Sequence, residues 1–198
     1  MIEYLLVPAA YLVGSISSAI LIARLKHLED PRDVGSGNPG ATNILRYGGK
    51  TAAALTLLGD VVKGAIPVVI TRSITGDSVV LALVGLAAFL GHLYPVFFRF
   101  RGGKGVATAF GVWLGLSPWV ALALLLTWLL IAALFRYSSL AALVASFAAP
   151  AYVWWVLYGQ LPYLVASIAM SVLLCWRHRA NIRNLFAGKE DKIGHMDG

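Results

Sequence analysis

Residues 35–46, which read GSGNPGATNILR, have the composition of an anion-binding loop. Three glycines within six residues allow backbone amides to approach an anion closely. Asn38 followed by Pro39 is typical of a helix N-cap and a first helical position, so a short helix is predicted to begin there. On that helix Asn38, Thr42 and Arg46 fall on one face. Amides at a helix N-terminus, beside a hydroxyl and a guanidinium, favour phosphate binding.

Residues 99–105, RFRGGKG, form a second glycine-rich segment. The segment lacks the spacing of a P-loop and joins two apolar stretches, which excludes nucleotide binding. Gly102 and Gly103 expose backbone amides, and Lys104 supplies a positive charge. A helix is predicted to start at about Gly105, so this segment also has the chemistry of an anion site.

Residues 177–185, RHRANIRNL, form a third polar segment after the last apolar stretch. If that stretch continues as a helix, His178 and Asn181 share a face, and Arg177 is a neighbour of Asn181 one turn away. An apolar face suited to the membrane interface is formed by Ile182, Leu185 and Phe186.

The remaining titratable residues are few. Asp60 and Lys63 lie three residues apart inside an apolar stretch, where charges are rare and cost a few kcal/mol. We expect them to pair with each other, either as a purely structural pair or in support of the polar site. His92 is expected to be either a hydrogen-bonded core residue or a catalytic one, and His27 and His195 are expected in a loop and in the tail.

Several known patterns are absent from the sequence. No Gly-x-Ser-x-Gly elbow occurs. No histidine has an aspartate five residues later, so the His-x-x-x-x-Asp pattern of the large acyl-CoA glycerolipid acyltransferase family is missing. The polar segments carry no carboxylate cluster, so we expect no bound metal and no cofactor. The lone Cys175 is expected to be a buried spacer.

The composition requires lipid as the solvent for most of the chain. Of the 198 residues 59% are hydrophobic and 13% charged, with a mean hydropathy of +0.78. A soluble domain is about 45–50% apolar with roughly a quarter of its residues charged. The N-terminal apolar run carries Glu3 and no preceding basic residue, which predicts a retained span rather than a signal peptide. We predict a single membrane domain over residues 1–198.

Apolar stretches long enough to cross a bilayer, about 20 residues each, predict an all-α, polytopic helical bundle. Six are clear: Ile2–Leu25, Thr51–Thr71, Val79–Phe98, Trp119–Phe135, Leu140–Tyr158 and Pro162–Trp176. In the first of them Ala10, Gly14 and Ser18 form a small-residue stripe that suits close contact between helices in lipid.

Val106–Leu116 is apolar but short, and either forms a further span or continues as one long helix to Phe135. Pro118 favours a break because proline cannot donate to the helix ladder. With seven spans and the N-terminus outside, every basic residue except Arg72 and Lys63 lies in or beside a cytoplasmic loop, as the positive-inside rule requires. We therefore predict seven transmembrane helices, the fourth short and shielded, with a cytoplasmic C-terminus. This placement explains the net charge of +7 without nucleic-acid binding.

Each polar segment also has a simpler interpretation. Residues 35–46 could be a turn whose Arg46 contacts lipid headgroups, and residues 99–105 a basic loop that only orients the chain. Residues 177–185 could be a tail that only holds the membrane surface. Three segments rich in glycine, asparagine and basic residues on one membrane face nevertheless favour one composite anion site.

Three stretches resemble the motifs of a known family. They are Gly-Ser-Gly-Asn-Pro-Gly-Ala-Thr-Asn at 35–43, Arg-Gly-Gly-Lys-Gly-Val-Ala-Thr at 101–108 and Arg-His-Arg-Ala-Asn-Ile-Arg-Asn-Leu at 177–185. They are similar to the three motifs of the bacterial acyl-phosphate-dependent glycerol-3-phosphate acyltransferases. The spans between them match too, so the resemblance covers essentially the whole chain. Asn184 departs from the pattern, which has a basic residue there.

The resemblance implies an enzyme that moves a fatty acyl group from an acyl phosphate to the 1-hydroxyl of sn-glycerol 3-phosphate. The products would be lysophosphatidic acid and phosphate, in the first acylation step of phospholipid synthesis. The enzyme would be a multi-pass protein of the bacterial cytoplasmic (inner) membrane with its active site on the cytoplasmic face. Its partners would be both substrates, membrane lipid and, transiently, a soluble acyl-phosphate synthase; we expect a monomer.

An acyl phosphate already has a good leaving group, so direct transfer without an acyl-enzyme is expected. Catalytic roles at the donor phosphate would fall to Ser36, Arg46 and Lys104, assisted by the amides of Gly37 and Gly103. Four further residues complete the predicted binding set on the first two motifs: Asn38, Thr42, Asn43 and Gly102.

The acceptor would be held by the third motif. His178 and Asn181 would orient glycerol 3-phosphate, with Arg177 or Arg179 on its phosphate. The group that removes the hydroxyl proton is either His178 or an oxygen of a substrate phosphate.

Two other classes of function share these features. A transporter or channel for an organic phosphate needs a path to the outside. The predicted outer loops are short and carry Arg72 as their one basic residue, which argues against a transport function. A scaffold for lipid-synthesis enzymes predicts that alanine substitutions in the inner loops leave function intact.

Overall fold

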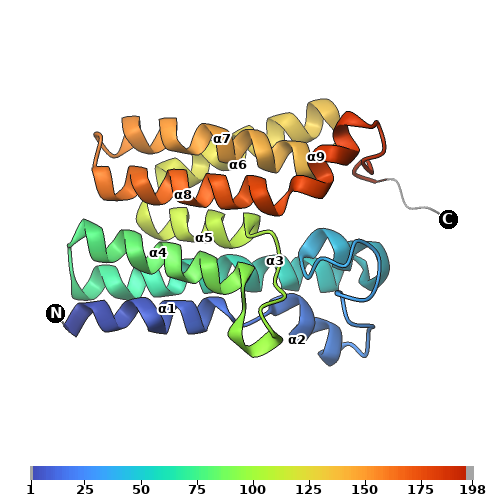
Figure 1. Ribbon diagram of the computed structural model, residues 1–198, viewed down its shortest axis with the longest axis horizontal. Coiled ribbons are helices and arrows are strands. Elements are labelled where there is room, and N and C mark those ends of the chain that lie inside the picture. The colour runs from blue at the N-terminus through green and yellow to red at the C-terminus, as the bar shows by residue number, and fades with distance from the viewer. Residues whose placement is uncertain (1, 195–198) are drawn as a thin grey trace. The chain divides into compact units, whose positions relative to one another are not determined.

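The structure, a computed structural model, describes residues 2–194 and contains helices and no strand within that range (Figure 1). This confirms the predicted all-α class. In chain order the elements are η1 (Ile2–Leu5), α1 (Leu6–Gly14), α2 (Ser18–Leu25), α3 (Ala41–Ile74), α4 (Ser78–Leu93), η2 (Val96–Phe98), α5 (Val106–Leu116), α6 (Pro118–Phe135), α7 (Ser138–Val156), α8 (Leu161–Arg177) and α9 (Arg179–Phe186). His195, a predicted tail residue, lies outside the described residues.

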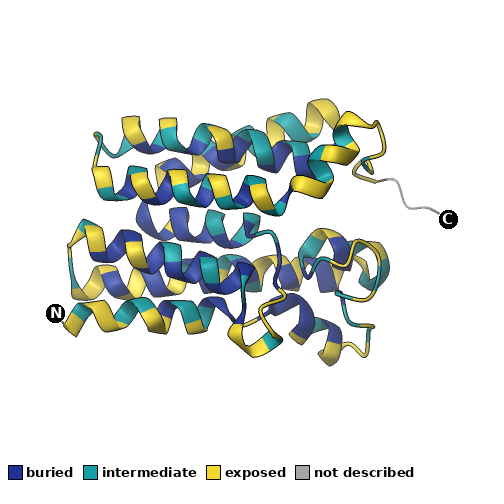
Figure 2. Cartoon of the chain, viewed as in Figure 1, coloured by how far each residue is buried: buried dark blue, intermediate teal, exposed yellow. Residues whose placement is uncertain are grey.

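The chain divides into two compact units, Met1–Leu116 and Ser117–Gly198. The first contains α1 to α5, and the second contains α6 to α9. Buried and exposed residues alternate along the individual helices (Figure 2), as they do when one side of a helix packs on its neighbours. One functional domain over residues 1–198 stays a prediction.

The apolar helices have the lengths that a bilayer requires. Five candidate spans lie in the described part of the chain: Ile2–Leu25, Ala41–Ile74, Ser78–Phe98, Pro118–Phe135 and Ser138–Val156. Helices α8 and α9, bent by 60° at their junction, would make a sixth if they form one span. Helix α5 has 11 residues and is too short to cross an average bilayer unaided. The count of seven and the orientation stay predictions.

The first apolar stretch is a candidate span with the predicted bounds, Ile2–Leu25, but its helix is interrupted. Helix α1 ends at Gly14 and α2 begins at Ser18. Ser15 Oγ donates to the Tyr11 carbonyl at 2.8 Å, and Ser17 is extended at φ −86° and ψ 100°. Serines compete for backbone groups in this way and so interrupt helices. The break leaves the Ile16 carbonyl available to a partner outside its own helix.

Small residues let α1 and α4 approach closely. A Cβ placed on Gly14 would collide with the Ala88 carbonyl, and one on Gly91 would collide with the Tyr11 carbonyl. The predicted close contact at Gly14 is therefore confirmed. Helices α3 and α5 meet in the same way, because a Cβ on Gly111 would collide with the Val61 carbonyl.

Helix α3 begins later than the sequence predicted and bends soon afterwards. The expected N-cap at Asn38 is wrong: Gly40 is the capping residue, with an extended backbone at φ −150° and ψ 164°, and its N–H bonds to the Asn38 carbonyl at 2.9 Å. Gly49 then interrupts the helix at φ 80° and ψ 175°. Residues 41–48 therefore form a separate short helix before the long apolar one.

Proline and serine separate α5 from α6. Ser117 is extended, its Oγ accepts the Val120 N–H at 3.4 Å, and Pro118 occupies the first turn of α6. Of the two predicted alternatives, two separate helices are confirmed and one long helix to Phe135 is wrong. The physical reason is that proline at this position starts a helix more readily than it continues one.

Candidate active site

The first glycine-rich loop is organised around one buried asparagine. Asn43 Oδ1 accepts the Ser36 N–H at 2.9 Å, and its Nδ2 donates to the carbonyls of Pro31 at 2.9 Å and Val34 at 3.0 Å. The side chain is 2% exposed. Gly35, with a φ of 58°, passes so close that a Cβ there would collide with Asn43 Oδ1. The amide thus takes the place of a strand or helix ladder in satisfying the loop backbone.

An ion pair between Arg32 and Asp30 also stabilises the loop. Arg32 holds the Asp30 carboxylate through two guanidinium hydrogen bonds of 2.9 and 2.7 Å, and it donates to the Phe98 carbonyl at 3.4 Å. These bonds lower the pKa of Asp30 below its usual value of 3.8 and raise the pKa of Arg32. Tyr47 Oη adds a hydrogen bond of 3.1 Å to the Glu29 carbonyl.

Three of the predicted phosphate-binding side chains are on the surface of this loop and helix. Ser36, Thr42 and Arg46 are exposed, and Thr42 and Arg46 lie one turn apart on α3. The predicted shared helical face is wrong for Asn38, because that residue precedes the helix. Gly37, also at a positive φ of 66°, turns the backbone beside Ser36.

The second glycine-rich segment follows a tight turn. Phe98 N–H and Phe100 N–H both donate to the Pro95 carbonyl, at 3.1 and 2.9 Å, and Arg99 and Phe100 are left-handed. Gly102 and Gly103 are buried against His92, and Lys104 is half-buried. Helix α5 starts at Val106, which confirms the predicted start at about Gly105.

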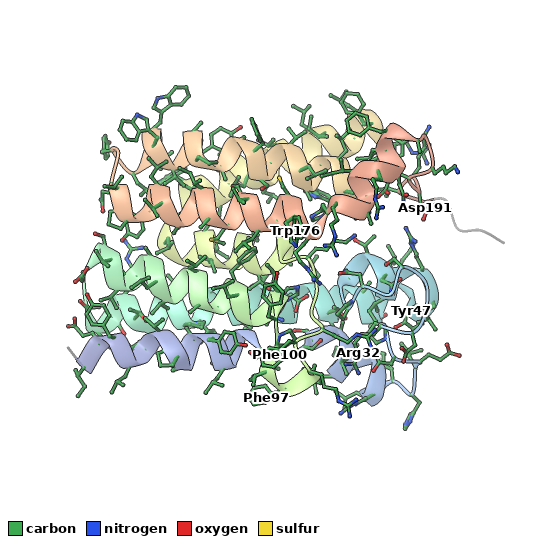
Figure 3. The ribbon with its side chains drawn as sticks, in the orientation of Figure 1. Arg32, Tyr47, Phe97, Phe100, Trp176 and Asp191 are labelled. Atoms are coloured by element: carbon green, nitrogen blue, oxygen red, sulfur yellow. The ribbon has the colours of Figure 1, made fainter. Side chains whose placement is uncertain are left out.

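The first unit brings the two glycine-rich segments together. A Cβ on Gly103 would lie 3.1 Å from the Pro39 carbonyl of the first loop. Figure 3 shows Arg32 beside the turn that carries Phe97 and Phe100, in agreement with the Arg32–Phe98 hydrogen bond. The backbones of both segments therefore meet at one corner of the first unit, where the Gly37 N–H donates to the Val34 carbonyl at 3.1 Å and the Gly103 N–H donates to the His92 carbonyl at 3.2 Å.

Three buried polar side chains lie beneath this corner. Lys63 Nζ is 2.8 Å from Asp60 Oδ1 and donates to the Ile16 carbonyl, also at 2.8 Å. The predicted pairing of Asp60 with Lys63 is confirmed. His92 Nδ1 lies 3.6 Å from Asp60 Oδ1, so His92 faces the carboxylate but does not reach hydrogen-bond length.

The third polar segment belongs to the second unit. The condition considered above, that the last span continues straight as a helix, is not met, because α8 ends at Arg177 and α9 leaves at 60°. The amide of His178 is shared between the carbonyls of Leu174 at 3.0 Å and Cys175 at 3.1 Å, which tightens the last turn. His178 Nδ1 lies 2.8 Å from the Leu174 carbonyl, which can only accept. Nδ1 therefore carries the proton, and the neutral ring has its lone pair on Nε2.

Asn181 is held by a residue that the sequence did not single out. Glu190 Oε1 accepts from Asn181 Nδ2 at 2.7 Å and from Ser139 Oγ at 2.5 Å. The tail is fixed further along, where Ile193 N–H donates to the Arg136 carbonyl at 2.6 Å. A carboxylate within ten residues of Asn181 was the only signal for Glu190 in the sequence.

The arginines of the third segment differ in their surroundings. Arg179 stacks on Trp176, with its guanidinium carbon 5.1 Å from the ring centroid, and donates to the Trp176 carbonyl at 3.2 Å. Arg177 is half-buried, and Arg183 is exposed. Within residues 2–194, no group of three His, Cys, Asp or Glu side chains is placed to hold a metal ion.

The chain is similar to proteins of one family. A sequence profile described as Glycerol-3-phosphate acyltransferase matches residues 4–188. The glycerol-3-phosphate acyltransferase of Methylococcus capsulatus is 56% identical over 194 residues, which cover 98% of this chain and 97% of that protein. The enzyme of the same name from Thioalkalivibrio sulfidiphilus is 56% identical over 190 residues, which cover 96% and 93%.

Solved structures agree with the sequence relatives. PlsY (YgiH), described as an integral membrane glycerol 3-phosphate acyltransferase, matches in its glycerol 3-phosphate form with a TM-score of 0.93 and 46% identity. Its lysophosphatidic acid form matches with a TM-score of 0.91 and 44% identity. Each match covers 98% of this chain and 96% of the other.

Proposed function

We propose, from the premise that the chain belongs to the glycerol-3-phosphate acyltransferase family, that it acylates glycerol 3-phosphate to lysophosphatidic acid. The observation that carries this proposal is the match to PlsY over 98% of the chain, in forms named for glycerol 3-phosphate and for lysophosphatidic acid. The apolar helices support a multi-pass location in the bacterial inner membrane. The chemistry would take place at the cytoplasmic face.

The acyl donor is an acyl phosphate in this proposal. Support comes from the first unit, where two glycine-rich segments meet and where Ser36, Arg46 and Lys104 provide a hydroxyl and two positive charges. A hydroxyl donor and positive charges aimed at one phosphate stabilise its departure as an anion. A coenzyme A ester would not place a phosphate next to the reacting carbonyl.

The transfer is direct. The 1-hydroxyl oxygen of glycerol 3-phosphate attacks the acyl carbonyl carbon and forms the ester bond. The bond from that carbon to the phosphate oxygen breaks, and its electron pair leaves with inorganic phosphate. The hydroxyl proton passes to His178 Nε2 or to a phosphate oxygen; the Leu174 carbonyl supports the first choice, because it holds the tautomer with a basic Nε2.

The acceptor belongs to the third segment. Asn181 orients glycerol 3-phosphate, and Glu190 in turn orients the Asn181 amide. Arg177 or Arg179 binds the phosphate of the acceptor; the stacking of Arg179 on Trp176 favours Arg177 for this role, since Arg179 would have to leave the ring.

The test is an assay of purified protein with palmitoyl phosphate and radiolabelled glycerol 3-phosphate, beside palmitoyl-CoA as alternative donor. We expect lysophosphatidic acid from the acyl phosphate alone. Lys104→Ala should lower kcat by about 10²–10³-fold, as loss of one oxyanion-stabilising group does. Arg99→Gln, which removes an exposed cation from the preceding turn, is the matched control and should keep normal activity.

Three results would contradict the proposal. Product from palmitoyl-CoA but not from palmitoyl phosphate would exclude the donor. Accumulation of acylated Ser36 with donor alone would exclude direct transfer. A folded protein that forms no product from either donor would withdraw the enzymatic function altogether.

A further inference from the structure

The interruption between α1 and α2 is held against α3 by two contacts. Lys63 Nζ donates to the Ile16 carbonyl at 2.8 Å. One turn earlier on α3, a Cβ on Gly59 would lie 2.7 Å from Ser18 Oγ, so the first residue of α2 lies directly against the glycine. The two contacts flank Ser17, the N-cap of α2. Helix α3 therefore determines where the chain leaves α1 and enters α2.

The Ile16 carbonyl lies outside the hydrogen-bond ladders of both helices. Ile16 N–H donates back to the Val13 carbonyl at 3.1 Å, and the ladder of α2 begins only at the Ser17 carbonyl, which accepts the Leu21 N–H at 3.0 Å. Within a bilayer no water is available to such a carbonyl, so leaving it without a donor is costly. Lys63 supplies the donor, and its positive charge lies where the end of α1 carries partial negative charge.

Asp60 acts as the counter-ion that allows Lys63 to be buried. Its Oδ1 is 2.8 Å from Lys63 Nζ, and both residues are at most 6% exposed. Apolar residues of similar volume often replace a buried ion pair without loss of stability, so packing alone does not account for these two residue types. The hydrogen bond to the Ile16 carbonyl does account for the lysine, because no apolar side chain can make it.

Helix α2 in turn supports the short helix at the start of α3. Ala19 and Ala23 of α2 form one buried apolar cluster with Ile44 of that short helix. Ile44 is fully buried, its neighbour Asn43 holds the first glycine-rich loop, and Arg46 follows two residues later. Close-packed interiors transmit displacements, and alanine has no rotamers with which to absorb them. A shift of α2 therefore displaces the short helix.

We infer that Lys63 is a positioning residue for the donor phosphate. Its hydrogen bond to the Ile16 carbonyl sets the direction of α2, and α2 holds the short helix so that Ser36 and Arg46 are in place for the acyl phosphate. Lys63 touches neither substrate in this arrangement. The inference rests on the proposed function, because it assigns Lys63 to the donor half of that reaction.

The test separates the hydrogen bond to Ile16 from the ion pair. Asp60→Asn/Lys63→Met removes both charges and the amine donor, while methionine keeps a long unbranched side chain in the same space. We expect the KM for palmitoyl phosphate to rise by about 10- to 100-fold, since displacements of about 1 Å have effects of this order. The KM for glycerol 3-phosphate should stay at the wild-type value.

Asp60→Asn alone should show the opposite pattern. Lys63 then loses its counter-ion, so the thermal unfolding midpoint should fall below that of the double variant, in which no charge of the pair is left buried. The amine still donates to the Ile16 carbonyl in either protonation state, so the donor KM should stay near the wild-type value. Lys50→Met, which removes an exposed lysine from the same helix, is the control and should change neither quantity.

A second variant moves α2 and leaves every charge in place. Gly59→Ala puts a methyl group 2.7 Å from Ser18 Oγ, so the start of α2 must shift. Alanine otherwise favours a helix more than glycine does, so a harmful effect would come from this contact. We expect a rise in the KM for palmitoyl phosphate, again without a change in the KM for glycerol 3-phosphate.

The outcomes are distinct. An unchanged donor KM in the folded double variant, or equal rises for both substrates, would overturn the inference while the wild-type activity still supports the proposed function. A donor KM that rises as much in Asp60→Asn as in the double variant would also overturn it, because the ion pair would then account for the effect. If the double variant does not fold, Gly59→Ala decides, and an unchanged donor KM there overturns the inference. A wild type that does not use acyl phosphate refutes the proposed donor first and the role of Lys63 with it.

Discussion

The Asn43 side chain makes backbone hydrogen bonds in the loop that precedes α3, as a helix or strand partner would elsewhere. Residues 31–36 have no ladder of their own, and the Asn43 side chain supplies one acceptor and two donors to their backbone. Its predicted substrate contact stays a prediction, but both of its N–H groups are already committed to the loop. The same three bonds place Ser36, the predicted hydroxyl at the donor phosphate, on the surface of the loop.

Asn43→Ala should therefore destabilise the protein as well as inactivate it. Removing the amide leaves the Pro31 carbonyl and the Ser36 N–H without this partner and the Val34 carbonyl with only the Gly37 N–H, which should cost about 3 kcal/mol in unfolding free energy. Thermal and denaturant unfolding in detergent would measure it. Asn184→Ala, at an exposed site, is the control; equal stability of the two variants would contradict the role of Asn43.

The Asp30–Arg32 pair predicts a specific response to acid. Because the pKa of Asp30 is lowered in the folded protein, its contribution to stability is fully present above 3.8, the ordinary value, and is lost as the pH falls through the lower folded value. The difference in unfolding midpoint between wild type and Asp30→Asn should thus be constant from about pH 6 to pH 4 and shrink only below it. A difference that already shrinks between pH 6 and pH 5 would contradict this assignment.

At the scale of elements, two breaks determine where polar groups can emerge from apolar helices. The serine-rich interruption after α1 presents the Ile16 carbonyl to Lys63, which allows a charged side chain to be buried in the first unit. The interruption at Gly49 separates the short helix that carries Thr42 and Arg46 from the apolar part of α3. Both breaks rest on local backbone chemistry and not on proline.

Gly49 offers a clean test of the second break. A Cβ there meets nothing within 4 Å, so the effect of Gly49→Ala comes only from the positive φ, and should be about 1 kcal/mol of lost stability. Gly76→Ala is the matched control, since Gly76 also has open space but no positive φ. We expect reduced activity for Gly49→Ala alone, because strain there shifts Arg46. Equal unfolding midpoints for the two variants would contradict the prediction.

At the scale of the whole molecule, the predicted topology places the short connections outside and the polar segments inside. In a Cys175→Ser background, the single substitutions Ser73→Cys and Gln160→Cys should each give a protein that reacts with a membrane-impermeant maleimide in intact cells. The Lys189→Cys variant in the same background should react only after the cells are permeabilised. Labelling of position 189 in intact cells would refute the seven-span arrangement and would favour an even number of spans.

The sequence alone determined the class of the molecule, and it predicted the chemistry of its polar segments. Composition and the length of apolar runs identify a helical membrane protein, because lipid offers no partner for unpaired backbone groups. Glycine-rich segments next to basic residues predict anion sites from local properties, and the structure shows that the first two segments meet. The resemblance of three motifs predicted the family, which the relatives confirm.

Only the tertiary structure decided which residues support the site. The hydrogen bonds from Arg32 to Phe98 and from Asn181 to Glu190, and the contact of His92 with Gly103, join residues far apart in the chain or on different elements. The helix start at Ala41 and the bend at His178 likewise depend on competing backbone hydrogen bonds whose outcome residue preferences do not settle. Sequence patterns report periodicity and local propensity, whereas these contacts depend on how the helices pack.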